Sequence, residues 1–365
     1  MKIGIIVEPY EEKNASGIAL CILNQTKHFL MLDKDNEYLI YTSSPFKKER
    51  LSANAKNILI PRSFFGKNLW FLKNAYFNKI LIPDILIFNM PLLPLILPER
   101  VKTVPIFYEV VSEFGSGVRE KILNIFWGFL AGFALKRAPL IITPSYASKD
   151  DLCGFYKINP DKVKTIHLGF QNPDEFKGIA LDSEKNHVPY FLFIGKAKFK
   201  KNIHGIVNGF IKFKKKFNTN HKLIFIGSYG GKYYEEILKN LRASSLEEEV
   251  IFKGYIYDDF YAVFKNAESL VFPSFREGFG MPIIEAMYLG VPVITSNVSS
   301  MPEVAGGAAL LVDPRNPEEI AEAMAKIAFD RGLREDLISR GIERAKQFSW
   351  QDHASQFLKY LELRN

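Results

Sequence analysis

Cysteine is scarce in this sequence. Only Cys21 and Cys153 occur among its 365 residues, and neither stands in a C-x-x-C or histidine-rich context. A disulfide framework needs more cysteines than this, and a structural zinc site needs clustered ligands. The sequence therefore predicts a protein of a reducing compartment without a metal site, and we expect a cytoplasmic location.

Long uninterrupted apolar runs are also absent. The first run ends at Glu8-Pro9 and is too short for a signal peptide. Residues 80–98 are long enough to cross a bilayer, but four prolines would break any helix there. Residues 122–135 are far shorter than the ~20 residues that a membrane span needs. We therefore predict no transmembrane segment.

Nothing in the chain resembles a nucleic-acid-binding motif, although its net charge is +8. The excess is uneven, because residues 1–180 hold 23 basic and 17 acidic side chains and residues 181–365 hold 25 and 23. A basic first half suits an anionic membrane surface or an anionic acceptor. We expect no nucleic-acid partner.

Two domains are predicted, because 365 residues exceed one ordinary core and suit two of ~150–200 residues. Continuous apolar runs alternate with helical patterns in both halves, which is typical of parallel strands covered on both faces. Residues 171–188 are polar and without periodicity, as in a linker. We expect an N-terminal domain over 1–172 and a C-terminal domain over 173–349.

The predicted fold class is therefore α/β, with two Rossmann-like domains facing across a cleft. In open α/β sheets, ligands bind beyond the carboxyl ends of the strands. A last helix over residues 350–365 follows Ser349, a suitable N-cap. We expect that helix to pack back on the N-terminal domain.

The segment 269–285 carries the clearest chemistry. A strand (269–274) leads into the loop FREGFG, and a helix opens at Met281-Pro282. Glycines allow close backbone approach, and a helix N-terminus is a ready anion site for a diphosphate. Glu277 and Glu285 are placed so that both can point at one ligand. The pattern favours a nucleotide-sugar site over a capping glutamate and a solvent-facing one.

This segment resembles family 4 of the retaining glycosyltransferases, which have the GT-B fold. The E-x7-E motif of that family is matched by Glu277 and Glu285, within the similar stretch 277–314. Within the family, the chain is most similar to a mannosyltransferase-like branch of surface polysaccharide synthesis. The resemblance implies that Glu285 binds the donor ribose. It also implies that Glu277 and the backbone of residues 278–280 hold the sugar and phosphates.

Lysines follow the first strand of the second domain, in IGKAKFKKN (194–202). They can neutralise a diphosphate leaving group without a metal, unless the loop is merely a solvated basic one. The family pattern has a basic pair that Lys200 and Lys201 match. The family also implies backbone contacts to the base from FKGYIYDDF (252–260) and to the phosphates from the glycine loop near Gly17.

A departure from the family occurs at the end of the strand near residues 104–110. Relatives usually have His-Asp there, and this chain has Tyr108-Glu109. Tyr108 can donate a hydrogen bond, and Glu109 or Glu113 can serve near the acceptor hydroxyl. The alternative is a local misalignment in a variable loop.

The predicted function is transfer of a mannose-like or glucose-like hexose from a nucleoside diphosphate sugar to a glycan or polyprenyl-linked hydroxyl, with retention and without a metal or other cofactor. The predicted catalytic residues are Glu277, Lys201, Tyr108 and Glu109. The predicted donor-binding residues are Gly17, Lys196, Lys200, Lys201, Gly254, Tyr255, Ile256, Glu277, Gly278, Phe279, Gly280, Met281 and Glu285. Two alternatives stay open: a catalytically silent sugar-nucleotide-binding subunit and a sugar-nucleotide epimerase of the same fold.

Residues 62–82 and 119–137 interleave aromatic side chains with lysine and arginine. One interpretation is a surface that lies on anionic lipid, peripherally on the inner face of the membrane, where a polyprenyl-linked acceptor would be met. The other interpretation is a pair of core helices of the first domain.

Overall fold

A computed structural model describes residues 1–8, 17–46, 51–90, 97–109, 118–170, 188–256 and 260–363. The chain divides into two compact units. Unit 1 comprises Met1–Gly169 and Ser349–Asn365, and unit 2 comprises Phe170–Phe348. The predicted boundary between residues 172 and 173 lies outside the described residues.

Unit 1 is built on a seven-stranded parallel sheet with the order β3-β2-β1-β4-β5-β6-β7. Its strands are β1 (Lys2–Ile6), β2 (Glu37–Thr42), β3 (Ala55–Leu59), β4 (Ile85–Asn89), β5 (Lys102–Ile106), β6 (Ile141–Thr143) and β7 (Val163–Thr165). Its helices are α1 (Gly17–Leu32), α2 (Phe64–Phe77), α3 (Val118–Arg137), α4 (Tyr146–Tyr156) and α12 (Trp350–Glu362), with 3-10 turns η2 (Lys79–Leu81) and η3 (Pro160–Lys162).

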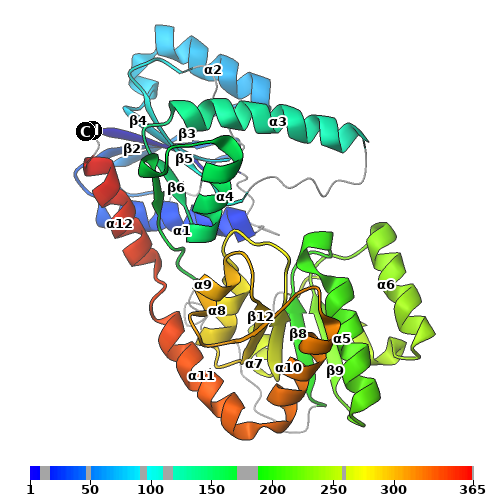
Figure 1. Ribbon diagram of the computed structural model, residues 1–365. Coiled ribbons are helices and arrows are strands. Elements are labelled where there is room, and N and C mark those ends of the chain that lie inside the picture. The colour runs from blue at the N-terminus through cyan, green and yellow to red at the C-terminus, as the bar shows by residue number, and fades with distance from the viewer. Residues whose placement is uncertain are drawn as a thin grey trace. The chain divides into compact units, whose positions relative to one another are not determined.

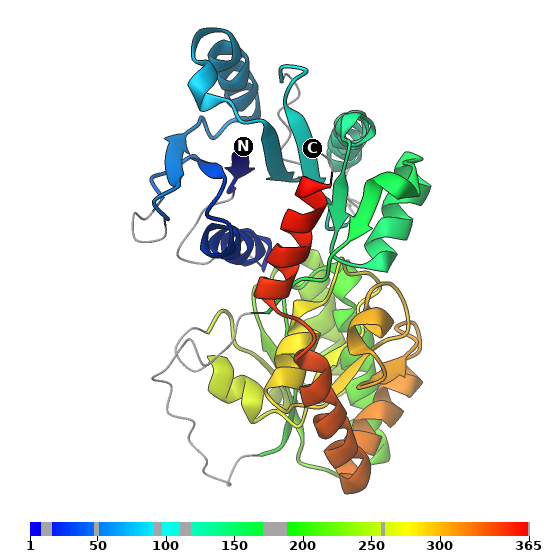
Figure 2. The same cartoon turned by 90° about the vertical axis from the view of Figure 1, so that its left-hand side faces the viewer.

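The helices of unit 1 cover both faces of its sheet (Figures 1 and 2). Phe71 of α2 joins a core cluster with Tyr41 and Phe88, on which residues of α3 also pack. On α1, the ring of Phe29 lies 5.1 Å from that of Phe357 in α12. Burying each such aromatic side chain contributes about 2–3 kcal/mol. The last helix begins as predicted, with Asp352 N donating to Ser349 Oγ at 2.9 Å.

Unit 2 is built on a six-stranded parallel sheet with the order β10-β9-β8-β11-β12-β13. Its strands are β8 (Tyr190–Ile194), β9 (Lys222–Ile226), β10 (Val250–Phe252), β11 (Ser269–Phe272), β12 (Val293–Ser296) and β13 (Leu310–Val312). Its helices are α5 (Ile203–Lys216), α6 (Gly231–Ala243), α7 (Phe260–Lys265), α8 (Met281–Tyr288), α9 (Met301–Ala305), α10 (Pro317–Phe329) and α11 (Arg331–Ala345), with 3-10 turns η5 (Phe199–Lys201) and η6 (Glu247–Glu249).

Both sheets confirm the predicted α/β class with Rossmann-like units. In each sheet the second and third strands are added one after another on one side of the first strand, and the later strands are added on its other side. The direction in which strands are added therefore reverses between β1 and β4 and between β8 and β11. Such a reversal leaves room for a ligand at the carboxyl ends of the two central strands. Among the described residues, no helix combines the length and apolar character that crossing a bilayer requires.

Candidate functional site

The two loops predicted to bind the donor follow the two central strands of unit 2. The lysine loop leaves β8, the FREGFG loop leaves β11, and Leu192 pairs with Leu270 across these strands. Both loops therefore begin at the reversal of strand order, at the edge where an open α/β sheet binds ligands.

A buried ion pair joins these loops. Lys201 Nζ lies 2.6 Å from Glu277 Oε1, and the Glu277 side chain is about nine-tenths buried. The same ammonium group lies 4.6 Å from the centre of the Phe272 ring. A lysine held between a carboxylate and an aromatic face keeps its charge in a place from which water is largely excluded. The predicted residues Lys201 and Glu277 are thus in direct contact.

Asn202 fixes the lysine loop in place. Its backbone is left-handed (φ 56°), and its side chain accepts a hydrogen bond from Gly205 N at the start of α5. Its Nδ2 donates to the carbonyl of Pro273 at 3.0 Å and to that of Pro314. Phe275 N donates to the carbonyl of Lys200 at 2.8 Å. These bonds hold the loop after β8 against the loop after β11.

Two serines after β12 fix the FREGFG loop from its other side. Ser299 Oγ donates to the carbonyl of Glu277 at 2.9 Å. Ser300 Oγ lies 2.9 Å from the carbonyls of both Glu277 and Phe279. Sequence reasoning assigned no role to Asn202, Ser299 or Ser300. Their signal was only a small polar residue after a strand and before a helix, which is common to many loops.

Helix α8 starts where the FREGFG loop ends. Gly280 has φ 104°, a conformation that L side chains rarely adopt, and Pro282 stands in the first turn. The first N–H groups of the helix are therefore left for a ligand at this end. One turn further, burial raises the pKa of the half-buried Glu285 to about 7. Burial, followed by the charge of Glu285, raises the pKa of Tyr261 to about 12.

The loops after β8, β9 and β10 are joined by backbone hydrogen bonds. Ala197 N donates to the carbonyl of Ser228, and Gly227 N donates to that of Gly254, each at 2.8 Å. A Cβ at Gly227 would lie 2.2 Å from Gly195 O, so only glycine allows this approach. The predicted residues Gly254, Tyr255 and Ile256 follow β10 at the same edge of the sheet as the ion pair.

The remaining lysines and glycines of the prediction differ in exposure. Lys196 is exposed and Lys200 is half-buried, and both belong to the loop after β8. Gly278 and Met281 are half-buried, whereas Phe279 is buried and its ring packs edge-on against Phe348 at 5.7 Å. Phe279 therefore contributes its backbone to the loop surface and its side chain to the core.

Three predicted residues lie in unit 1. Gly17 is exposed and begins α1. Tyr108 is buried beyond β5, and its carbonyl accepts a hydrogen bond from Ser148 Oγ at 2.6 Å. Its hydroxyl has no partner among the described residues, and burial, followed by Cys21, raises its pKa above the usual range. Glu109 is half-buried. Glu113 lies outside the described residues.

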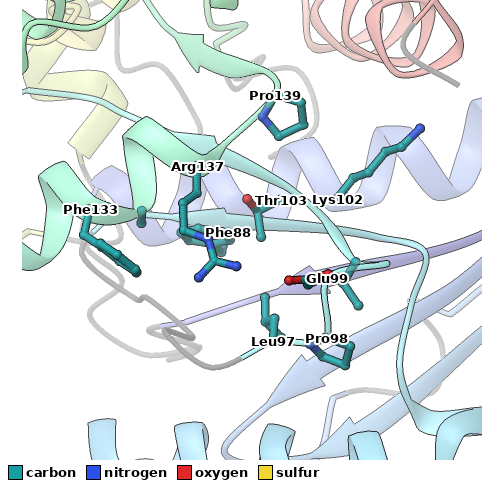
Figure 3. Close-up of a pocket in the computed structure, with 11 residues that line it drawn as sticks. Phe88, Leu97, Pro98, Glu99, Lys102, Thr103, Phe133, Arg137 and Pro139 are labelled. Atoms are coloured by element: carbon teal, nitrogen blue, oxygen red, sulfur yellow. The ribbon is translucent and has the colours of Figure 1, made fainter.

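A cavity of about 250 Å³ lies elsewhere in unit 1. Its walls come from the start of β5, the segment before it and the end of α3, and Figure 3 shows Arg137 and Glu99 pointing into it from opposite sides. None of the predicted site residues lines it. No group of three or more His, Cys, Asp or Glu side chains in the described part of the chain could hold a metal ion.

The fold and the site of unit 2 are those of a nucleotide-binding class of protein. Unit 2 is a Rossmann-like unit whose strand reversal carries a buried lysine–carboxylate pair beside a glycine-started helix, as suits a nucleotide ligand. Residues 177–344 match the family described as glycosyl transferases group 1. The predicted resemblance to this family is therefore confirmed over residues 177–344.

Curated relatives point the same way. The chain is 32% identical over 238 residues to O-antigen chain mannosyltransferase B of Escherichia coli, covering 63% of this chain and 62% of that one. It is 30% identical over 208 residues to O-antigen chain mannosyltransferase RfbU of Salmonella typhimurium, covering 56% of each. The chain thus spans less than two thirds of the relatives it matches.

Solved structures confirm the GT-B fold. Anabaena HepE in complex with UDP and glucose superposes with a TM-score of 0.75 at 16% identity, over 99% of both chains. WaaG, a glycosyltransferase of lipopolysaccharide biosynthesis, superposes with a TM-score of 0.68 at 15% identity, over 97% of this chain and 98% of that one.

Proposed function

We propose that this protein is a retaining glycosyltransferase that moves a mannose-like or glucose-like hexose from a nucleoside diphosphate sugar to a hydroxyl of a glycan or lipid-linked acceptor. The observation that carries the proposal is the Lys201–Glu277 pair, buried where the strand order of unit 2 reverses and beside the start of α8. The similarity to O-antigen mannosyltransferases favours surface polysaccharide synthesis.

Each donor group has a matching partner in unit 2. The ribose hydroxyls donate to the Glu285 carboxylate, and the backbone of Gly254, Tyr255 and Ile256 contacts the base. The diphosphate meets Lys201 and the first N–H groups of α8, with Lys196 and Lys200 adding positive charge. Glu277 and the loop from Gly278 to Met281 hold the transferred sugar.

In the reaction, the bond between the anomeric carbon and the diphosphate oxygen breaks while the acceptor oxygen bonds to the same face of that carbon. The acceptor proton passes to the departing phosphate. Negative charge grows on the diphosphate, so Lys201 and the N-terminus of α8 lower the barrier by stabilising the leaving group. These groups supply the positive charge within the protein, and we propose that no metal is needed. Activity that is lost with a chelator and restored by manganese would contradict this part.

The acceptor side is assigned to unit 1. We propose that the backbone of Gly17, at the start of α1, contacts the donor phosphates. We also propose that Tyr108 and Glu109 contact the acceptor hydroxyl. The buried Tyr108 hydroxyl without a described partner supports a donor role toward a substrate. The same Tyr108-Glu109 pair, in place of His-Asp, also keeps open a sugar-nucleotide-binding subunit without transfer activity.

An anionic membrane surface is proposed as a partner of α2. Phe65, Leu69, Tyr76, Phe77 and Ile80 form an exposed apolar stripe on α2 and η2, with Phe65 79% and Phe77 84% exposed. Residues 62–82 contain four basic and no acidic residues. Such a helix inserts aromatic side chains among lipid headgroups while its lysines contact anionic ones.

Flotation tests the membrane proposal. Wild type is expected to float with phosphatidylglycerol vesicles and not with phosphatidylcholine vesicles, and Lys73→Glu with Lys79→Glu to reduce flotation several-fold. Lys56→Glu, an exposed charge reversal on β3, is the matched control. Equal flotation of all three proteins would contradict the proposal.

The transfer itself is tested by release of free nucleotide from a panel of donor sugars. We expect slow hydrolysis of one donor by the wild type and loss of at least about 100-fold in Glu277→Gln. Glu335→Gln on the surface of α11 is the control that retains activity. Binding without turnover, with any acceptor, would support the silent subunit. Conversion of the donor into its sugar epimer would support an epimerase.

A further inference from the structure

A lysine is buried on the inner face of α2. Lys67 is 6% exposed, in the first turn of a helix whose outer face carries the apolar stripe. No hydrogen bond or ion pair joins its ammonium group to any residue that the structure describes. A buried charge without a partner costs free energy, so such a group is expected where a ligand supplies the partner.

The nearest charges do not neutralise Lys67. Burial lowers its pKa, the nearby Glu8 raises it, and the nearby Arg62 lowers it again. Glu8 is itself buried, and its carboxylate accepts a hydrogen bond from Ser43 N at 2.5 Å. It therefore bonds to the backbone beyond β2 rather than to the lysine. Among the described residues whose charges act on Lys67, one other cation and one carboxylate are present, so these three groups carry a net positive charge.

These groups gather at the edge of the sheet that binds ligands. Glu8 follows β1, Ser43 follows β2, and Arg62 and Lys67 follow β3, which are neighbouring parallel strands. Their carboxyl ends therefore meet at one edge, and the N-terminus of α2 opens there. Ser63 caps that helix by accepting a hydrogen bond from Gly66 N, and the remaining first-turn N–H groups add to the positive potential.

We propose that Lys67, with the charge of Arg62, binds a phosphate group of the acceptor substrate. The phosphate-binding proposal depends on the proposed function in one respect, which is that the acceptor carries the phosphate. A phosphate supplies the negative charge and the hydrogen-bond acceptors that the buried ammonium group lacks, and Glu8 accepts from a hydroxyl beside it. A neutral sugar would supply hydroxyls but no negative charge for the ammonium group of Lys67.

Binding of inorganic pyrophosphate to the full chain tests the proposal. Equilibrium dialysis without donor or acceptor is expected to show two sites in the wild type. Lys201→Gln removes the one in unit 2, and Lys67→Gln weakens the other at least about tenfold. Lys67→Arg keeps the charge and is expected to keep the site, and Lys56→Gln is the surface control. A Lys67→Gln protein that retains both sites overturns the proposal, as does a wild type with one site that Lys201→Gln abolishes.

A second measurement avoids the risk that Lys67→Gln fails to fold. Pyrophosphate is expected to slow acylation of Lys67 by an amine-reactive reagent several-fold relative to Lys56, as read by mass spectrometry of the peptides. Stronger protection by farnesyl diphosphate assigns the phosphate to a lipid-linked acceptor, and equal protection assigns it to a soluble one. No protection by either compound overturns the proposal. Because no sugar donor is present, these results do not depend on whether the protein transfers sugar.

Discussion

The charged residues at the carboxyl ends of the strands are arranged differently in the two sheets. In unit 2, Lys201 and Glu277 are buried in contact with each other. In unit 1, Lys67 and Glu8 are buried near each other without forming an ion pair. A charge that is already paired by the protein can be held in a fixed position before the substrate arrives, whereas an unpaired one awaits its partner.

The polar side chains around the charged residues also differ between the two units. Asn202, Ser299 and Ser300 tie the loops of unit 2 to one another through backbone carbonyls. In unit 1, the hydroxyl of Tyr108 has no partner among the described residues, and the nearby Glu8 bonds to Ser43 N rather than to Lys67. Preorganised charge is most useful where charge develops during a reaction. The comparison therefore supports our proposal that unit 2 binds the donor and its leaving group and that unit 1 binds the acceptor.

Breaking the ion pair of unit 2 should have the largest effect. Lys201→Met leaves Glu277 as an uncompensated buried carboxylate, which costs about 3 kcal/mol of folding free energy. Donor hydrolysis should fall at least about 100-fold, because the leaving phosphate loses its cation. Urea unfolding and nucleotide release measure the two effects. Lys212→Met, which removes a surface pair with Glu318, is the control, and an equal loss in both variants would contradict the assignment.

Removing one support of the FREGFG loop should have a smaller effect. Ser300→Ala deletes the hydroxyl that lies beside the carbonyls of Glu277 and Phe279, at a cost of about 1–3 kcal/mol. Calorimetry should show nucleoside diphosphate binding about tenfold weaker than in the wild type. Ser244→Ala, at the end of α6, should bind normally. Unchanged binding by Ser300→Ala would mean that the loop is held without this serine.

The smallest effect is a pH dependence that belongs to unit 2. Burial raises the pKa of Glu285 to about 7, and ribose hydroxyls donate more strongly to its ionised form than to the neutral acid. Nucleotide binding therefore releases a proton, and affinity should rise by about tenfold as pH increases from 6 to 8. Glu285→Gln, measured at the same pH values, accounts for titration of the phosphates themselves. The prediction is wrong if wild type and Glu285→Gln show the same slope.

The sequence predicted most of the fold because its strands are buried on both faces. Continuous apolar runs such as residues 190–195 match observed strands closely, and helix α10 starts at a proline after an asparagine cap. Local signals of this kind depend on neighbouring residues only. The repeated strand–helix pattern indicated parallel sheets, but the order of the strands within each sheet joins segments far apart in the chain and was not predicted.

The candidate site was predicted only in part, for a physical reason. Glu277 and Lys201 were each assigned to the donor, but their contact joins loops 76 positions apart in the sequence. The hydrogen bonds of Asn202 to Pro273 and Pro314 span 71 and 112 positions, and those of Ser300 to Glu277 and Phe279 span 23 and 21. The segment 62–82 was interpreted either as a lipid-facing surface or as a core helix. Helix α2 has one exposed apolar face and one buried face that holds Phe71 and Lys67, so neither interpretation alone describes it.

The central claim is that unit 2 activates a nucleoside diphosphate sugar for transfer with retention. Proton NMR of the slow reaction with water, followed through its first minutes on the donor that the panel selects, reads both products at once. The account predicts free nucleoside diphosphate together with a sugar whose anomeric configuration is that of the donor. Release of a sugar with inverted configuration, or cleavage of no donor in the panel, would contradict it.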